Sequence, residues 1–226
     1  MFSQRQDLTR LIDHTLLRAE AVPADVGRLC DEALEYGFAT VCVAPCYVEM
    51  AFKHLEKSQV RVCTVVGFPL GHTTVSVKIV EAMEAIKHGA QELDLVINRG
   101  ALKSGDDQYV RHEILNIVNV SQKALLKVIL ETGALTRDEI VRGARLAMEA
   151  GARWIKTSTG FGPRGASVED VKLLKETVGD TGFIKAAGGI RDLKTVEAMV
   201  RAGASRVGTS HGVSIVQEYL QLHAKR

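Results

Sequence analysis

Two lysines are prominent because each ends a short apolar run and is followed by small residues. Lys156 follows Trp154-Ile155 and precedes the hydroxyl- and glycine-rich residues 157–162. Lys185 repeats this arrangement, with a glycine pair three residues beyond it. An ammonium at the end of a buried strand is costly unless it is paired or neutralised. Packing alone therefore does not explain two such lysines.

A pair of lysines can produce a nucleophile that forms an imine. A free lysine has a pKa of about 10.4, so only about 0.04% of it is the neutral amine at pH 7. A second ammonium at an assumed ~6 Å adds about 3 kcal/mol of repulsion at an effective dielectric constant of 20. That repulsion is equivalent to roughly two pH units, and burial adds to it. The neutral amine can then attack a carbonyl group.

Acidic residues at other strand ends complete the set. Asp13, Asp94 and Glu131 each lie in or just after a short apolar run. Side chains alternate along a strand, so Asp94 faces the opposite side from Leu93 and Leu95. A carboxylate beside an imine can move protons during bond cleavage. The set predicts imine-based carbon–carbon chemistry. The alternative is an unreactive salt-bridge network in which the lysines neutralise these acids.

Glycine-rich turns follow the same predicted strands and suggest a phosphate on the substrate. Gly160 follows Lys156, Gly188 and Gly189 follow Lys185, and Gly208 and Ser210 come later. Backbone N–H groups in such turns bind phosphate, and barrels often use the turns after their last two strands. Tight turns also need glycine for conformational reasons, so each turn alone is a weak signal.

Four other polar residues near these turns have weaker assignments. Arg191 could contact a phosphate or could be a solvated residue at a helix start. We expect His14, His72 and His211 to be structural or solvated, as a lone histidine in a loop usually is. Their spacing gives no metal-binding triad.

The elements that position these residues alternate between short apolar runs and amphipathic stretches, which is typical of βα units. Strands are expected at residues 11–14, 39–43, 60–66, 92–97, 125–130, 152–156, 183–186 and 205–208. Helices are expected at residues 23–36, 47–57, 74–88, 107–121, 136–150, 167–178, 192–202 and 213–223. Eight units of about 27 residues predict a (β/α)8 TIM barrel, with eight parallel strands inside a ring of helices. An open doubly wound sheet is the structural alternative.

One of these helices, at residues 74–88, is expected to pack on the barrel through an apolar side. That side carries Val77, Val80, Met83, Ala85 and Ile86. Apolar residues at helical spacing usually face a core.

Length and composition indicate one domain spanning residues 1–226. The 226 residues can bury roughly 70–75% of the extended-chain surface. The net charge of +2 gives no reason to expect nucleic acid or an anionic membrane as a partner. No apolar run reaches the ~18 residues of a membrane span, and the first residues have no apolar signal core. We therefore expect the protein in the cytoplasm.

The four cysteines are expected to be buried free thiols. Cys30, Cys42, Cys46 and Cys63 form no C-x-x-C pair. Cys42 and Cys46 are four residues apart, but Pro45 breaks any shared helical face. We expect no metal site there.

Six segments together resemble one known family, the deoxyribose-phosphate aldolases, which are class I aldolases of the barrel fold. The shared segments are I-D-H-T-L-L at 12–17, V-C-V-A-P at 41–45, G-F-P-L-G at 67–71, E-L-D at 92–94, I-K-T-S-T-G-F at 155–161 and K-A-A-G-G-I-R at 185–191. The resemblance covers nearly the whole chain. It implies reversible cleavage of 2-deoxy-D-ribose 5-phosphate to acetaldehyde and D-glyceraldehyde 3-phosphate, without a metal or an organic cofactor.

The resemblance also implies roles for individual residues. Lys156 would form the Schiff base, Lys185 would lower the pKa of that amine, and Asp94 would transfer protons. The turns Gly188-Gly189 and 208–210 would hold the phosphate. A homo-oligomer, dimer or tetramer, is implied as well.

Two residues depart from the family pattern. Members often have Asn where this chain has Ala44, and a second Ser where it has His211. The second change lies in a predicted phosphate turn, so it bears on the preference for phosphorylated substrates.

Two other functions fit the same residues. One is a different imine-forming barrel lyase, such as a transaldolase or another sugar-phosphate aldolase. The other is a catalytically silent barrel that binds a sugar phosphate, with its lysines locked in salt bridges. Trapping an imine with borohydride separates the silent barrel from both enzymes.

Overall fold

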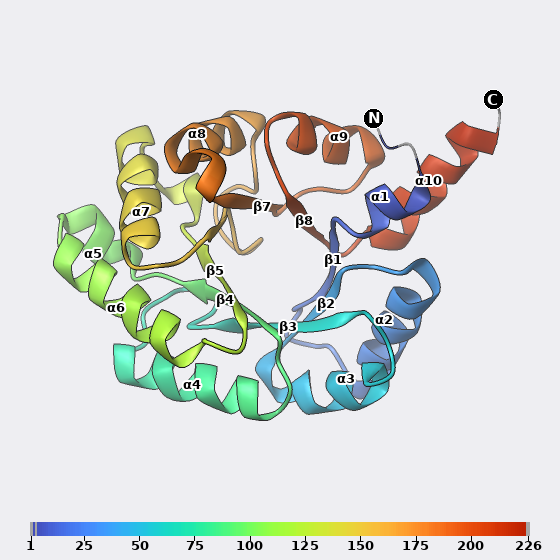
Figure 1. Cartoon of the computed structure of the whole chain (residues 1–226), viewed down its shortest axis with the longest axis horizontal. Helices are drawn as coiled ribbons and strands as arrows, with labels where there is room; N and C mark the ends of the chain where they lie inside the picture. Colours follow the sequence, from blue (N-terminus) through green and yellow to red (C-terminus); the bar gives the residue numbers. More distant parts are fainter. Residues whose placement is uncertain (1, 3, 225–226) are drawn as a thin grey trace.

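Eight parallel strands close into a barrel (Figure 1) in the computed structural model, which describes residue 2 and residues 4–224. The strands are β1 (Ile12–Leu16), β2 (Thr40–Val43), β3 (Arg61–Val66), β4 (Glu92–Val96), β5 (Leu125–Ile129), β6 (Trp154–Lys156), β7 (Phe183–Ala187) and β8 (Arg206–Thr209). Each strand pairs with the next in sequence, and β8 pairs with β1 to close the sheet. The predicted TIM barrel is confirmed, and the open sheet is wrong.

Helices surround the barrel (Figure 1) at each of the places where the sequence predicts one. They are α2 (Pro23–Tyr36), α3 (Val48–Leu55), α4 (Val75–Lys87), α6 (Asp107–Val120), α7 (Arg137–Glu149), α8 (Val168–Val178), α9 (Leu193–Arg201) and α10 (Gly212–Ala224). The additional helical segments are α1 (Arg5–Thr9), α5 (Arg99–Ser104) and the 3-10 turns η1 (Pro45–Tyr47), η2 (Thr132–Ala134) and η3 (Gly179–Thr181). Across the described residues, no helix is long and apolar enough to cross a bilayer.

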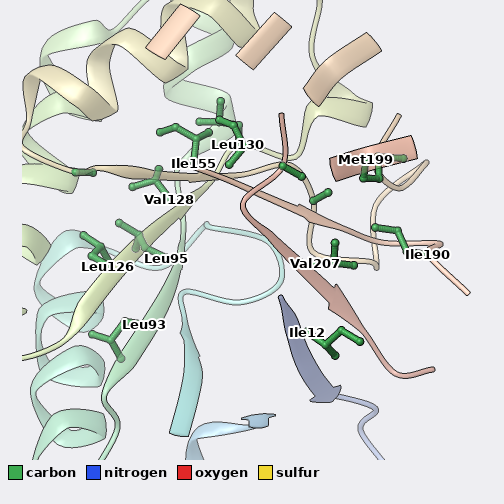
Figure 2. Close-up of a cluster of buried hydrophobic side chains, with 14 of the residues drawn as sticks. Ile12, Leu93, Leu95, Leu126, Val128, Leu130, Ile155, Ile190, Met199 and Val207 are labelled. Carbon is green, nitrogen blue, oxygen red and sulfur yellow. The ribbon is translucent and has the colours of Figure 1, made fainter. Parts of the chain in front are cut away.

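The alternation along β4 divides the interior of the barrel from the layer under the helices. Leu93 and Leu95 belong to the apolar cluster between strands and helices (Figure 2). Glu92 and Asp94 point the other way, into the barrel, and both are fully buried. The pleat of one strand therefore delivers a carboxylate to the centre of the molecule.

Helix α4 does not pack as its apolar residues suggest. Val77, Val80 and Met83 are 51%, 60% and 55% exposed, so this part of the expected apolar side is wrong. The inward face carries Ala85, as expected, together with the fully buried Lys78, whose Nζ lies 2.6 Å from Oε1 of Glu113. Lys78 also donates to the carbonyl of Gly71 in the β3–α4 loop and to that of Val96, the last residue of β4. This buried ion pair sets the rotation of the helix and leaves an apolar row outside.

The cysteines are all free, but they are not all buried. Cys30, Cys42 and Cys63 are buried as expected, whereas Cys46 is exposed. Pro45 begins the 3-10 turn η1 at this point, and the turn directs Cys46 away from the core. The expectation for Cys46 is therefore wrong.

Candidate active site

Lys156, the last residue of β6, and Lys185, in the middle of β7, lie side by side. They are register partners on adjacent strands, so both side chains enter the barrel at the same level. Lys156 Nζ lies 2.8 Å from Oδ2 of Asp94, and Lys185 Nζ lies 2.7 Å from the same oxygen. The structure thus brings together the three residues that the sequence singled out.

Asp94 is a buried carboxylate held by three ammonium groups. Lys127 Nζ contacts its second oxygen, Oδ1, at 3.0 Å, and the Cys63 thiol lies 3.4 Å from that atom. Burial alone would raise the pKa of Asp94, but Lys127, Lys156 and Lys185 hold it well below its usual value. Asp94 therefore stays ionised at neutral pH.

The ion pairs continue beneath Asp94 as a network. Lys185 Nζ also lies 2.6 Å from Oδ2 of Asp13, and Lys127 Nζ lies 2.6 Å from Oε2 of Glu92. Arg206 closes the network, because its Nε donates to Asp13 at 2.8 Å and its Nη2 lies 3.3 Å from Glu92. Asp13, one of the acids expected to complete the set, therefore lies inside the lysine cluster and supports Lys185.

Burial and charge oppose each other throughout this network. Burial lowers the pKa of Lys185, but Asp13 and Asp94 raise it well above its usual value. Lys127 behaves in the same way, with Asp94 as its main partner. Burial raises the pKa of Asp13, whereas Lys185 and Arg206 bring it far below normal. Lys127, Lys185, Asp13 and Asp94 are therefore charged at neutral pH.

Lys127 and Arg206 are functional candidates that the sequence reasoning missed. Lys127 is the register partner of Asp94 on β5, and it interrupts an otherwise apolar strand. A lysine at an inward position of an apolar strand was the sequence signal from which Lys127 could have been identified. Arg206 begins β8, and its partner Asp13 is 193 residues away in the sequence, so local sequence gives no sign of this pairing.

A cavity of about 580 Å³ opens above the lysines at the C-terminal ends of the strands. Lys156 lines it, and so do all five residues predicted to contact a phosphate: Gly160, Gly188, Gly189, Gly208 and Ser210. Among the described lysines, Lys156 alone reaches this cavity. The predicted nucleophile and the predicted anion-binding turns therefore share one space.

Four backbone N–H groups in these turns have no protein acceptor. Gly160, Gly188 and Gly189 adopt φ angles of +90°, +90° and +76°. Within residues 4–224, the N–H groups of these glycines and of Ser210 donate to no protein atom. Successive residues in such conformations form a concave nest of N–H groups that suits an anion. The N-terminus of α10 begins two residues after Ser210 and adds to the positive potential.

Gly208 has a different reason to be glycine. A Cβ atom there would lie 3.0 Å from Cε of Lys185 and 3.1 Å from Cβ of Ala187. A larger residue at position 208 would therefore crowd the side chain of Lys185, which explains the glycine independently of any contact between the Gly208 backbone and a substrate.

Glu131 does not join the lysine cluster. It is fully buried after β5, and its carboxylate accepts from the backbone N–H and the hydroxyl of Thr159. The unreactive alternative, in which Glu131 neutralises the lysines, is wrong for this residue. Its contact partner Thr159 lies in the β6–α8 loop beside Gly160.

The remaining polar candidates lie at the cavity wall or away from it. His14 is buried at the wall, with Nε2 2.6 Å from Oε2 of Glu32. Burial lowers the pKa of His14, while Glu32 opposes that effect. His211 and Arg191 also line the cavity, and His72 does not. His211 Nδ1 lies 3.1 Å from Oγ of Ser210.

One group of possible metal ligands lies beside the lysines. The ligand atoms of Cys42, Cys63 and Asp94 lie within 4.8 Å of one another. Both oxygens of Asp94 are already bound to ammonium groups, which would repel a cation. We assign no metal to this group.

Comparison with known proteins gives consistent results. A family model described as DeoC/LacD family aldolase matches residues 8–221. A deoxyribose-phosphate aldolase of Thermoanaerobacter sp. (strain X514) is 49% identical over 219 residues, covering 96% of this chain and 98% of the relative. Among solved structures, a putative deoxyribose-phosphate aldolase from Coccidioides immitis has a TM-score of 0.93 at 43% identity, covering 96% of this chain and 87% of that one. The tetrameric deoxyribose phosphate aldolase of Aeropyrum pernix has a TM-score of 0.91 at 34% identity, covering 98% and 94%.

Proposed function

Because the chain belongs to the DeoC/LacD family of aldolases, we propose that it is a deoxyribose-phosphate aldolase. It reversibly cleaves 2-deoxy-D-ribose 5-phosphate to acetaldehyde and D-glyceraldehyde 3-phosphate through a Schiff base. The observation that carries the proposed mechanism is that Lys156 lines the cavity, whereas its partners Lys127 and Lys185 are enclosed beneath it.

Lys156 is the nucleophile in this proposal, because it is the lysine of the cluster that borders the cavity. Lys127 and Lys185 are fully buried beneath it, and each also pairs with a second carboxylate, Glu92 and Asp13 respectively. Among the described residues Lys156 pairs with Asp94 alone, so it is the lysine least committed to the ion-pair network. Release of its proton gives the amine that attacks a carbonyl.

The bond changes follow from imine chemistry. Nζ of Lys156 adds to the C1 aldehyde of the open-chain sugar; the carbinolamine then takes up a proton by way of Asp94 and loses water, which gives the protonated imine. The C3 hydroxyl gives its proton to Asp94 through water, the C2–C3 bond breaks, and its electron pair moves toward the imine nitrogen. D-glyceraldehyde 3-phosphate leaves. The remaining enamine gains a proton at C2, and water releases acetaldehyde from the lysine.

Asp94 provides the route for protons between the two lysines. One of its oxygens contacts both Nζ atoms, so a proton can pass between them without crossing solvent. Its depressed pKa means that it does not hold a proton at rest. Lys185 remains the charged member of the pair.

The phosphate is held by the glycine turns. The unpaired N–H groups of Gly160, Gly188, Gly189 and Ser210 support this assignment, together with the nearby start of α10. Gly208 contributes mainly by giving Lys185 its space.

We also propose a single catalytic domain over residues 1–226, located in the cytoplasm, that assembles into a homo-oligomer, either a dimer or a tetramer. The exposed apolar row of α4, formed by Val77, Val80 and Met83, supports assembly. The Aeropyrum pernix relative is a tetramer.

The direct test is incubation with 2-deoxy-D-ribose 5-phosphate and measurement of both products. Wild type should release acetaldehyde and glyceraldehyde 3-phosphate in equal amounts, and Lys156→Leu should release neither. Absence of cleavage by a folded wild type would overturn the proposed activity. Cleavage by a folded Lys156→Leu protein would overturn the assignment of the nucleophile.

A further inference from the structure

Glu131 is a buried carboxylate in an unusual backbone conformation. It follows β5 directly and is fully buried, with φ at +61°. It is the one residue other than glycine with a positive φ in the described part of the chain. Such a conformation costs about 1–2 kcal/mol for a residue with a side chain, so something in the fold must require it.

The side chain explains the conformation, because it reaches into the β6–α8 loop. Thr159 donates its N–H to both carboxylate oxygens, at 3.2 and 3.4 Å, and its hydroxyl to Oε2 at 2.5 Å. The Thr159 hydroxyl in turn accepts the N–H of Phe161 at 3.0 Å. One carboxylate thereby fixes the residues on both sides of Gly160.

The fit between Glu131 and this loop leaves no spare space. A Cβ atom on Gly162 would lie 2.5 Å from Oε1 of Glu131. No basic side chain pairs with Glu131 in the described residues, so the loop itself supplies the partners of this buried charge.

The far end of the same loop rests on the other phosphate turn. Ala166 donates its N–H to the carbonyls of Ala187 and Gly188, both at 3.1 Å. A Cβ atom on Gly165 would lie 2.1 Å from the carbonyl oxygen of Gly188. The loop is therefore clamped between Glu131 on one side and the Gly188 turn on the other. Gly160 lies between these two attachments.

We propose that Glu131 is a positioning residue for phosphate binding, which holds the Gly160 N–H toward the anion without touching the substrate. The proposal rests on the proposed function for the identity of the substrate. It assigns Glu131 an effect on the phosphate end of the cavity and none on the reactivity of Lys156.

The test compares Glu131→Gln with wild type by three measurements. The glutamine side chain has the size of the glutamate it replaces and leaves the backbone conformation of residue 131 unchanged. Its NH2 group, however, is a donor and would face the donors of Thr159, so it cannot replace both carboxylate oxygens as an acceptor. Affinity for inorganic phosphate, measured by calorimetry, should fall about tenfold, the equivalent of losing one hydrogen bond to a charged group. The KM for 2-deoxy-D-ribose 5-phosphate should rise by a similar factor with a smaller change in kcat. Acetaldehyde carries no phosphate, so the rate at which borohydride traps it on Lys156 should stay the same.

Thr159→Val and Thr159→Ser provide a second pair of variants if Glu131→Gln folds poorly. Valine removes the hydroxyl that contacts Glu131 and should weaken phosphate binding, and serine should restore it. Glu218→Gln is the matched control, because Glu218 also accepts a backbone N–H, from Leu193 at 2.8 Å, but lies outside the cavity. It should leave all three measurements unchanged.

Two results would overturn the proposal. One is unchanged phosphate affinity in folded Glu131→Gln and Thr159→Val proteins. The other is an equal loss of acetaldehyde trapping, which would show a general structural role. If wild type binds phosphate but neither cleaves the sugar nor traps acetaldehyde, the proposed function fails, and the calorimetric comparison still decides the role of Glu131.

Discussion

Lys156 and Lys185 face each other across β6 and β7, and a single carboxylate oxygen contacts both of their nitrogens. They differ in access, because Lys156 borders the cavity and Lys185 is enclosed. This difference gives the two lysines different roles, with one amine able to meet a carbonyl and one ammonium fixed beside it.

Lys185→Leu should lower kcat by at least about 100-fold, since proton transfer by a positioned group typically contributes that much. It should also move the rising limb of the pH–rate profile to higher pH, because the fixed ammonium that disfavours a second one is gone. Steady-state kinetics between pH 5 and 10 measure both effects. The exposed Lys53→Leu variant serves as the control. A profile for Lys185→Leu that matches wild type would show that the like-charge argument is wrong.

Stability should fall at acid pH because the pKa values of Asp13 and Asp94 are lower in the folded state than in the unfolded chain. The unfolded chain binds more protons below about pH 4, so the free energy of unfolding decreases as pH falls through that range. Above the pKa that these aspartates have in the unfolded chain, their contribution to the free energy of unfolding is fully present. Urea unfolding at pH 3 to 7 measures the slope. Asp94→Asn should be less stable overall and have a shallower slope; an identical slope would contradict the assigned pKa shift.

Gly189→Ala should weaken binding of the phosphorylated substrate. No atom lies within 4 Å of the added Cβ, but φ is +76°, so the turn must shift and the N–H nest changes shape. Gly37→Ala is a matched control: φ there is +72°, the space is equally open, and the site ends α2 outside the cavity. Both variants should lose about 1 kcal/mol of stability. Only Gly189→Ala should raise the KM for 2-deoxy-D-ribose 5-phosphate, and equal KM values would count against the phosphate assignment.

Val80→Glu should weaken self-association if the exposed row on α4 forms a contact between copies. A carboxylate in the middle of an apolar interface must lose its hydration without gaining a partner. Light scattering coupled to size exclusion gives the mass in solution. Leu34→Glu, at an exposed leucine of α2, is the control. An unchanged oligomer in Val80→Glu would direct attention to a different surface.

Much of the fold and the central residues could be predicted because their signals are local. The alternation of Leu93, Asp94 and Leu95 turns the carboxylate inward, and the apolar residues before Lys156 and Lys185 mark two strands. Lys156 ends its strand as expected, whereas Lys185 lies in the middle of β7. The helix expected at residues 136–150 also has a local signal, a Thr136 and Glu139 capping box at the start of α7, in which Thr136 N–H donates to Glu139 at 2.8 Å. Register between neighbouring strands then brings the inward residues to one level.

The rest depends on contacts between distant residues. The orientation of α4 follows from the ion pair of Lys78 with Glu113, which outweighs an apolar row at helical spacing. Arg206 meets Asp13 only because the first and last strands close the barrel. In the sequence, Glu131 looks the same as the other acids at strand ends. Its left-handed backbone conformation turns the side chain toward Thr159 and away from the lysines.

The most direct measurement for the Schiff-base mechanism is intact mass after incubation with acetaldehyde and borohydride, on wild type and on Lys156→Leu. Wild type should gain one reduced two-carbon adduct, and peptide mapping should place it on Lys156. The variant should gain none while keeping its circular dichroism spectrum. An adduct of the same yield on folded Lys156→Leu, or no adduct on either protein, would contradict the assignment of Lys156 as the imine-forming residue.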